Sequence, residues 1–225
     1  MITDRRHEIS RLEAFSDAAF AFALTLLVVS LDVPRSYGDL TRTMRGIPSF
    51  ACCFALLVWI WHEHNMFFRR YGLQDGWTVV VNSGLMLVTL FYVYPLKFMF
   101  DSMFAKLGAV VGLQRMTLAQ LANASAIYGF GFCALFILFA LLYVRAYRKR
   151  DALGLTPVEI LETKAHIGHH VVSAGVGLLS VAVALGGPPA TAPMAPMTFA
   201  LMAPLHFAYG RYTAQKRRRA GAAQR

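Results

Sequence analysis

The sequence predicts an all-α, polytopic membrane protein. Three observations indicate this class: the composition, the long apolar segments and the placement of the basic residues. The chain has 225 residues, of which 57% are hydrophobic and only 15% are charged, and its mean hydropathy is +0.49. Soluble domains are about 45–50% apolar and about 25% charged. Because the apolar residues form long runs, we expect membrane-spanning helices and not one large soluble core.

Six apolar segments are each close to the ~20 residues that a helix needs to cross about 30 Å of hydrocarbon. We therefore expect six transmembrane helices in one domain over 1–215 and a basic cytoplasmic tail over 216–225. The last segment contains three prolines, which neighbouring helices tolerate inside a membrane. The expected spans are 12–33, 47–68, 77–100, 122–144, 165–187 and 190–210.

The 22 Lys and Arg residues predict the orientation. With six spans, most of them lie on the side that holds both termini, which makes that side cytoplasmic. The net charge of +10 then reflects cytoplasmic loops and a tail facing acidic lipids, and we expect no nucleic-acid partner. The chain is expected to be a multi-pass protein of the cell membrane. The opposite side holds Arg35, Arg42, Arg45, Lys97, Lys106 and Arg115.

The first span carries Ser16 and Asp17 inside an otherwise apolar run. A carboxylate buried in a span costs roughly 2.5–3.5 kcal/mol, so Asp17 needs a partner. At about 1.5 Å of rise per residue, His64 of the second span and Asn82 of the third lie at a similar depth. We expect these side chains, with Ser16, to form one hydrogen-bonded cluster in a polar inner layer. The outer layer is expected to be mostly apolar.

Helical periodicity gives this first span two faces. Ser10 and Glu13 have the spacing of a capping box, so the helix is expected to begin near Arg11. A step of about 100° per residue places Ser16 and Asp17 opposite an apolar stripe. Ordinary helix packing is one explanation of that stripe. The stripe consists of Ala18, Phe22, Thr25 and Val29.

The first span resembles the signature of the transmembrane protein 175 family of lysosomal and bacterial potassium channels. The matching residues are Arg11-x-x-x-Phe15-Ser16-Asp17, the apolar run through Thr25-Leu26-Leu27, and Pro34. Trp61-x-x-His64 with Phe68-Arg69 resembles the second span of that family. Asn82 and Pro95 resemble its third span less closely, because their spacing differs.

The resemblance implies a homotetramer in which the first helix of each subunit lines a central pore for potassium. It implies no enzymatic activity and no cofactor. Modest selectivity over sodium is expected, and protons are a second candidate ion. The implied pore-lining residues are Ala18, Phe22, Thr25 and Val29. The implied scaffold residues are Arg11, Phe15, Ser16, Asp17, Trp61, His64 and Asn82.

Two positions depart from the family pattern. Phe22 stands where members commonly carry a branched aliphatic residue. Four Phe22 side chains around the implied pore would therefore form a bulkier constriction. The acidic residue common near the outer end of the helix is Ser30 here, with Asp32 two residues later. Asp32 is either an outer-mouth carboxylate that concentrates cations or a solvated group at the helix end.

Two other classes of function remain open. A transporter with alternating access is one, although no paired broken helices from an inverted repeat are evident. A metal-dependent membrane enzyme is the other, because Glu162, His166 and His170 have helical ligand spacing. The chain has only seven histidines, fewer than a histidine-rich di-iron site needs. Its three cysteines lie in apolar runs and form no Cys-x-x-Cys pair.

Overall fold

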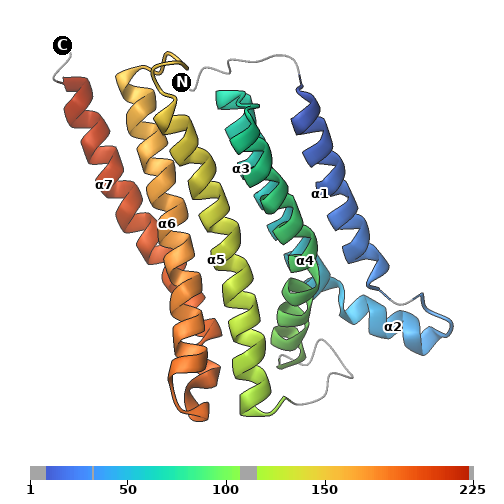
Figure 1. Cartoon of the computed structure of the whole chain (residues 1–225). Helices are drawn as coiled ribbons and strands as arrows, with labels where there is room; N and C mark the ends of the chain where they lie inside the picture. Colours follow the sequence, from blue (N-terminus) through green and yellow to red (C-terminus); the bar gives the residue numbers. More distant parts are fainter. Residues whose placement is uncertain (1–8, 32, 107–115, 223–225) are drawn as a thin grey trace.

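The computed structural model describes residues 9–31, 33–106 and 116–222, and every regular element in these ranges is helical. The long helices run alternately up and down, and α1 begins and α7 ends at the same end of the molecule (Figure 1). The elements are α1 Arg11–Val29, α2 Tyr37–Arg45, α3 Ile47–Tyr71, α4 Gly76–Lys106, α5 Leu118–Arg148, α6 Pro157–Gly186, the 3-10 segments η1 Pro189–Met194 and η2 Pro196–Leu201, and α7 Met202–Ala222.

Four of the described helices, α1, α4, α5 and α6, are long and apolar enough to cross a membrane. A fifth crossing is the pair α2 and α3, if the two helices count as one span with a bend of 46°. Each of the first five expected segments lies largely within one of these helices, although α1 ends at Val29 and not at 33. The chain is a multi-pass membrane protein. The count of six spans stays a prediction.

The sixth expected span, 190–210, is not one continuous helix. Its first half forms η1 and η2, and α7 begins only at Met202. Proline lacks the backbone N–H that an α-helix needs, so the prolines at 193 and 196 explain the break. α7 then continues to Ala222, so the expected basic tail begins inside a helix.

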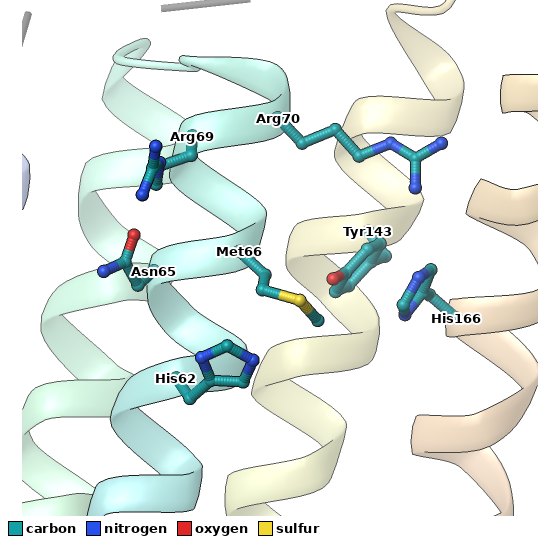
Figure 2. Close-up of a pocket in the computed structure, with 7 residues that line it drawn as sticks. All are labelled: His62, Asn65, Met66, Arg69, Arg70, Tyr143 and His166. Carbon is teal, nitrogen blue, oxygen red and sulfur yellow. The ribbon is translucent and has the colours of Figure 1, made fainter. Parts of the chain in front are cut away.

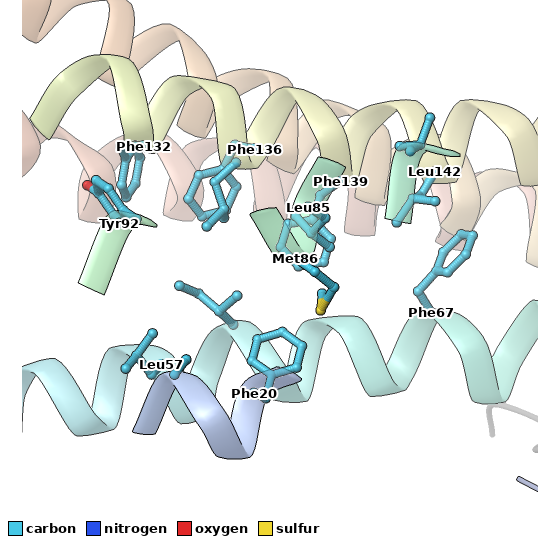
Figure 3. Packing of buried hydrophobic residues seen from close by; sticks show 14 of the residues in the cluster. Phe20, Leu57, Phe67, Leu85, Met86, Tyr92, Phe132, Phe136, Phe139 and Leu142 are labelled. Carbon is cyan, nitrogen blue, oxygen red and sulfur yellow. The ribbon is translucent and has the colours of Figure 1, made fainter. Parts of the chain in front are cut away.

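The core lies between α3, α4 and α5, with α1 packed on its side (Figure 3). Phe20 of α1, Phe67 of α3 and Leu85 of α4 are all nearly inaccessible to solvent. A row of phenylalanines on α5 completes this cluster. The row consists of Phe132, Phe136 and Phe139.

α5 and α6 approach each other closely where two glycines meet. A Cβ atom on Gly129 would lie 2.9 Å from the carbonyl oxygen of Gly177, and one on Gly177 would lie 3.0 Å from the backbone nitrogen of Cys133. Small residues permit such contact between membrane helices. The pair α5–α6 therefore forms a closely packed wall beside the core.

α1 occupies one edge of the chain, opposite α7 (Figure 1). It contacts α3 and α4, and only 22% of its apolar stretch is buried within the chain. Most of the surface of α1 is therefore available to another molecule or to lipid.

Candidate functional site

The start of α1 follows from a capping box. The backbone N–H of Glu13 donates to Oγ of Ser10 at 3.2 Å, and the backbone N–H of Ser10 donates to Oε2 of Glu13 at 2.8 Å. These bonds satisfy two amide groups that have no partner inside the helix. The predicted start of the helix at Arg11 is confirmed.

The two faces of α1 differ sharply in burial. Each buried residue lies two positions before a residue of the predicted stripe. Two positions correspond to a rotation of about 200° around the helix axis, so the buried residues face away from the stripe. All four residues of that stripe are exposed in the single chain, with Phe22 at 55% and Val29 at 72%. The buried residues are Ser16, Phe20, Ala23 and Leu27.

Ser16, Asn82 and His64 form a buried hydrogen-bonded chain through α1, α4 and α3. Nδ2 of Asn82 donates to Oγ of Ser16 at 2.9 Å, and Oδ1 of Asn82 lies 2.8 Å from Nε2 of His64. The His64 ring is also held by Phe20 and Phe68, at centroid distances of 5.4 Å and 4.6 Å. The structure therefore brings together three of the four residues of the expected cluster.

Asp17 makes a different contact. The indole N–H of Trp61 donates to its Oδ1 at 2.8 Å, so the carboxylate is satisfied by α3 and not by His64 or Asn82. Consecutive helical residues point about 100° apart, so Ser16 reaches α4 while Asp17 reaches Trp61 on α3. The expected single cluster is corrected to two adjacent contacts.

The remaining predicted residues of the first span are less engaged. Arg11 is exposed, and the ring of Phe15 is 62% exposed. Thr25 donates its hydroxyl to the carbonyl oxygen of Ala21 at 2.9 Å, which leaves the oxygen lone pairs of Thr25 on the exposed face. Asp32 lies outside the described residues.

The end of the bundle where α3 begins and α4 ends was expected to be mostly apolar, but it carries a polar cluster. Lys97 and Asp101 of α4 form an ion pair at 2.7 Å, and the hydroxyl of Ser49 on α3 donates to the same carboxylate. The i, i+4 spacing of Lys97 and Asp101 is the sequence signal that would have revealed the pair. Its link to Ser49 depends on the packing of two helices.

The metal-ligand set Glu162, His166 and His170 is not brought together. The carboxylate of Glu162 pairs with the guanidinium of Arg70, and Tyr71 hydrogen-bonds Thr163 at 2.8 Å, which ties α3 to the start of α6. His166 and His170 instead lie beside Glu63 of α3.

The family model described as endosomal/lysosomal potassium channel TMEM175 matches residues 11–93. This range includes α1, the Asp17–Trp61 hydrogen bond and the Ser16–Asn82–His64 chain. A protein of Marivirga tractuosa named "Potassium channel" is 37% identical over 96% of this chain and 92% of its own length. A potassium channel of Chamaesiphon minutus is 31% identical over 39% of this chain and 47% of its own length.

Two solved structures share the fold. A crystal structure of a variant of the potassium channel MtTMEM175, bound to a nanobody–MBP fusion protein, has a TM-score of 0.84 and 34% identity, over 95% of this chain and 97% of that one. The crystal structure of a TMEM175 homologue from Chamaesiphon minutus has a TM-score of 0.59 and 21% identity, over 90% of this chain and 96% of that one. At that identity the second likeness shows the fold alone.

Proposed function

The chain belongs to the family of the endosomal/lysosomal potassium channel TMEM175, and from that premise we propose that it conducts potassium ions through a pore lined by α1. Its relatives are named potassium channels, a class that performs no catalysis, so the metal-dependent enzyme is no longer a candidate. The channel names of these relatives also favour a pore over an alternating-access transporter.

The exposed stripe of α1 is the observation that carries the proposal. A helix at the edge of the subunit leaves Phe22, Thr25 and Val29 exposed while its opposite face is fixed to α3 and α4. Four such helices meeting around an axis would cover these faces and create stacked rings, the arrangement proposed for the assembled homotetramer. The Ser16–Asn82–His64 and Asp17–Trp61 contacts hold the opposite face of α1 to its own subunit.

The rings have distinct proposed roles. Apolar rings of Phe22 and Val29 would resist ions because stripping their hydration in an apolar neck is costly. Four Thr25 hydroxyl oxygens would replace part of that hydration, and potassium sheds water more readily than sodium. We expect modest potassium selectivity. Proton permeation stays a prediction, and His64 is only 1% exposed, away from the proposed path.

The proposed orientation places both termini in the cytoplasm of a cell with the protein in its cell membrane. The Arg70–Glu162 pair and the basic end of α7 would then lie at the cytoplasmic face, next to acidic lipids. Ser49, Lys97 and Asp101 would lie at the outer end.

Potassium and sodium flux into liposomes tests the pore. Thr25→Ala is expected to reduce the potassium-to-sodium permeability ratio, measured as a reversal potential, by at least about 3-fold. Phe22→Ala is expected to raise conductance, because it removes the bulkiest ring. Reversal potentials under a proton gradient measure the proton component of the same currents.

Each variant has a matched control elsewhere on the chain. Phe130→Ala changes a ring that is also 55% exposed, on α5, and Ser102→Ala removes an exposed hydroxyl that, like that of Thr25, bonds a carbonyl four residues earlier. Unchanged conductance in Phe22→Ala together with unchanged selectivity in Thr25→Ala would remove α1 from the pore.

A further inference from the structure

Three potential metal ligands meet between α3 and α6 at a place with no assigned role. Glu63 comes from α3, and His166 and His170 come from α6 one turn apart. One ligand atom from each residue lies within 4.8 Å of the other two. We propose that this group binds a divalent transition-metal ion, with zinc as the preferred ion, and fastens α3 to α6.

The separation of the ligand atoms is close to what zinc requires. Zinc bonds to nitrogen and carboxylate oxygen are about 2.0–2.2 Å long in tetrahedral sites, which places ligand atoms about 3.4 Å apart. The three atoms therefore need to close by no more than about 1.4 Å. Rotation of the half-buried Glu63 side chain would bring its carboxylate closer to the two imidazoles, and small χ rotations of the histidines would supply the rest of the movement without displacing a helix.

His170 supplies the second observation. Its ring is 4% exposed, and its Nε2 is buried with no hydrogen-bond partner among the described residues. Burying an imidazole nitrogen without a hydrogen-bond partner costs free energy. A metal ion held by this group would accept a lone pair from the His170 imidazole and so offset that cost. The ring is held in place by stacking on Phe139 at 5.2 Å and an interplanar angle of 16°.

His166 is also fixed in orientation. It stacks on Tyr143 of α5 at a centroid distance of 4.8 Å and an interplanar angle of 11°, and Figure 2 shows these two rings side by side. Ligands whose rings are already ordered lose little freedom when the ion binds. Two imidazoles thus stand ready on α6, and the carboxylate of Glu63 faces them from α3.

The chemistry of the set favours zinc over magnesium or calcium. Imidazole nitrogen suits zinc, whereas magnesium and calcium prefer an all-oxygen set. Three protein ligands leave a fourth position for water. A cavity of about 290 Å³ beside His166 has room for that water and gives the ion a way in. Its lining also includes Arg70, whose charge is balanced by Glu162.

A bound ion would connect α3 to α6 at a point deeper in the bundle than the Arg70–Glu162 and Tyr71–Thr163 contacts. α3 also carries Trp61 and His64, which hold α1. A metal ion at Glu63 would therefore stiffen the support of α1 while lying outside the stripe of exposed residues. At a zinc concentration about 100 times the dissociation constant, we expect the melting temperature to rise by about 5–10 °C.

The test uses the full chain without a polyhistidine tag, purified in detergent and stripped with a chelator. Zn²⁺ binding is measured by calorimetry, and Co²⁺ is added as a spectroscopic probe of coordination. We expect one ion per subunit and the visible absorption of tetrahedral Co²⁺. Glu63→Gln and His166→Ala should each weaken binding by more than about 100-fold, since loss of a supporting partner alone costs 10–100-fold.

Two controls separate this site from other histidines. His62→Ala alters the same cavity outside the ligand group, and His206→Ala removes the pair that His206 forms with His169, whose Nδ1 atoms lie 2.8 Å apart. Both variants should bind as the unmodified chain does. Binding that survives Glu63→Gln and His166→Ala, or that disappears in His206→Ala alone, would overturn the proposal. Glu63→Gln keeps the shape of the side chain, so its result does not depend on a folding defect.

Discussion

Asn82 connects α1 and α3 through a single side chain of α4. Its amide group donates to Ser16 and its carbonyl oxygen meets the ring of His64, and all three residues are almost completely buried. A buried polar group that loses its partner costs more than the bond itself contributes. An apolar residue at this position would therefore leave both neighbouring polar groups with one partner fewer.

Asn82→Ala should lower stability by about 1–3 kcal/mol, because it leaves Ser16 and His64 with one partner fewer each. For a chain of this size we expect the melting temperature in detergent to fall by about 3–10 °C. Asn65→Ala, the same change at a half-buried residue that lines the cavity on α3, is the control. Equal shifts in the two variants would show that the hydrogen-bonded chain contributes nothing.

Asp75 joins the beginning of α4 to the end of α5. Its Oδ1 accepts hydrogen bonds from the backbone N–H and the hydroxyl of Thr78, both at 2.9 Å, which caps α4. Its Oδ2 pairs with Arg145 at 2.9 Å and with Lys149. Burial alone would raise the pKa of this carboxyl group, but these bonds outweigh it and hold the pKa well below the usual 3.8.

This lowered pKa predicts a pH dependence with a definite sign. The ionised carboxylate contributes its full stability above about pH 3.8, and the contribution is lost as the pH falls through the lower pKa of the folded state. Asp75→Asn keeps a capping side chain but loses the ion pairs. The variant should melt at a lower temperature than the unmodified chain at pH 7.

Melting curves between pH 7 and pH 2.5 measure the effect. The difference between the unmodified chain and Asp75→Asn should be constant above about pH 4 and shrink below it. Asp151→Asn, at a side chain that is 87% exposed, should show no such difference at any pH. A gap that persists unchanged to pH 2.5 would mean that the ion pairs are not its source.

The assembled molecule depends on which surfaces meet around the proposed axis. α1 presents an exposed apolar face at one edge of the chain, and α6, which lies away from that edge (Figure 1), carries an exposed apolar side chain at Leu178. Both surfaces are apolar, so hydropathy does not distinguish a pore-lining surface from a lipid-facing one. Proximity between copies of α1 distinguishes them.

Val29→Cys, in a chain whose three native cysteines are replaced by alanine, should form disulfide-linked dimers when oxidised in membranes. Four copies meeting around one axis would place these side chains close to each other, and a disulfide requires Cα atoms about 4.4–6.8 Å apart. Leu178→Cys has a comparably exposed side chain and should remain monomeric on gels. Cross-linking of Leu178→Cys but not Val29→Cys would rule out the axial arrangement.

The sequence by itself determined the membrane class, the first five apolar segments, the capping box of α1 and the separation of its two faces. Each of these depends on local hydropathy or on helical spacing, which act within one segment of chain. Family membership was also evident from the short motifs of the first two spans. The break in the sixth expected span could not be predicted in the same way. Whether a membrane helix tolerates a proline or breaks at it depends on the helices packed around it.

Only the tertiary structure decided which polar groups meet. Ser16 and Asp17 are adjacent in the sequence, yet one bonds Asn82 and the other bonds Trp61, because consecutive helical residues face different neighbours. Glu162 has ideal ligand spacing with two histidines, yet it pairs with Arg70 and leaves Glu63 beside them. Spacing along one helix fixes which residues share a face, whereas the rotation and depth of the opposing helix select the partner, and those follow from packing of the whole bundle.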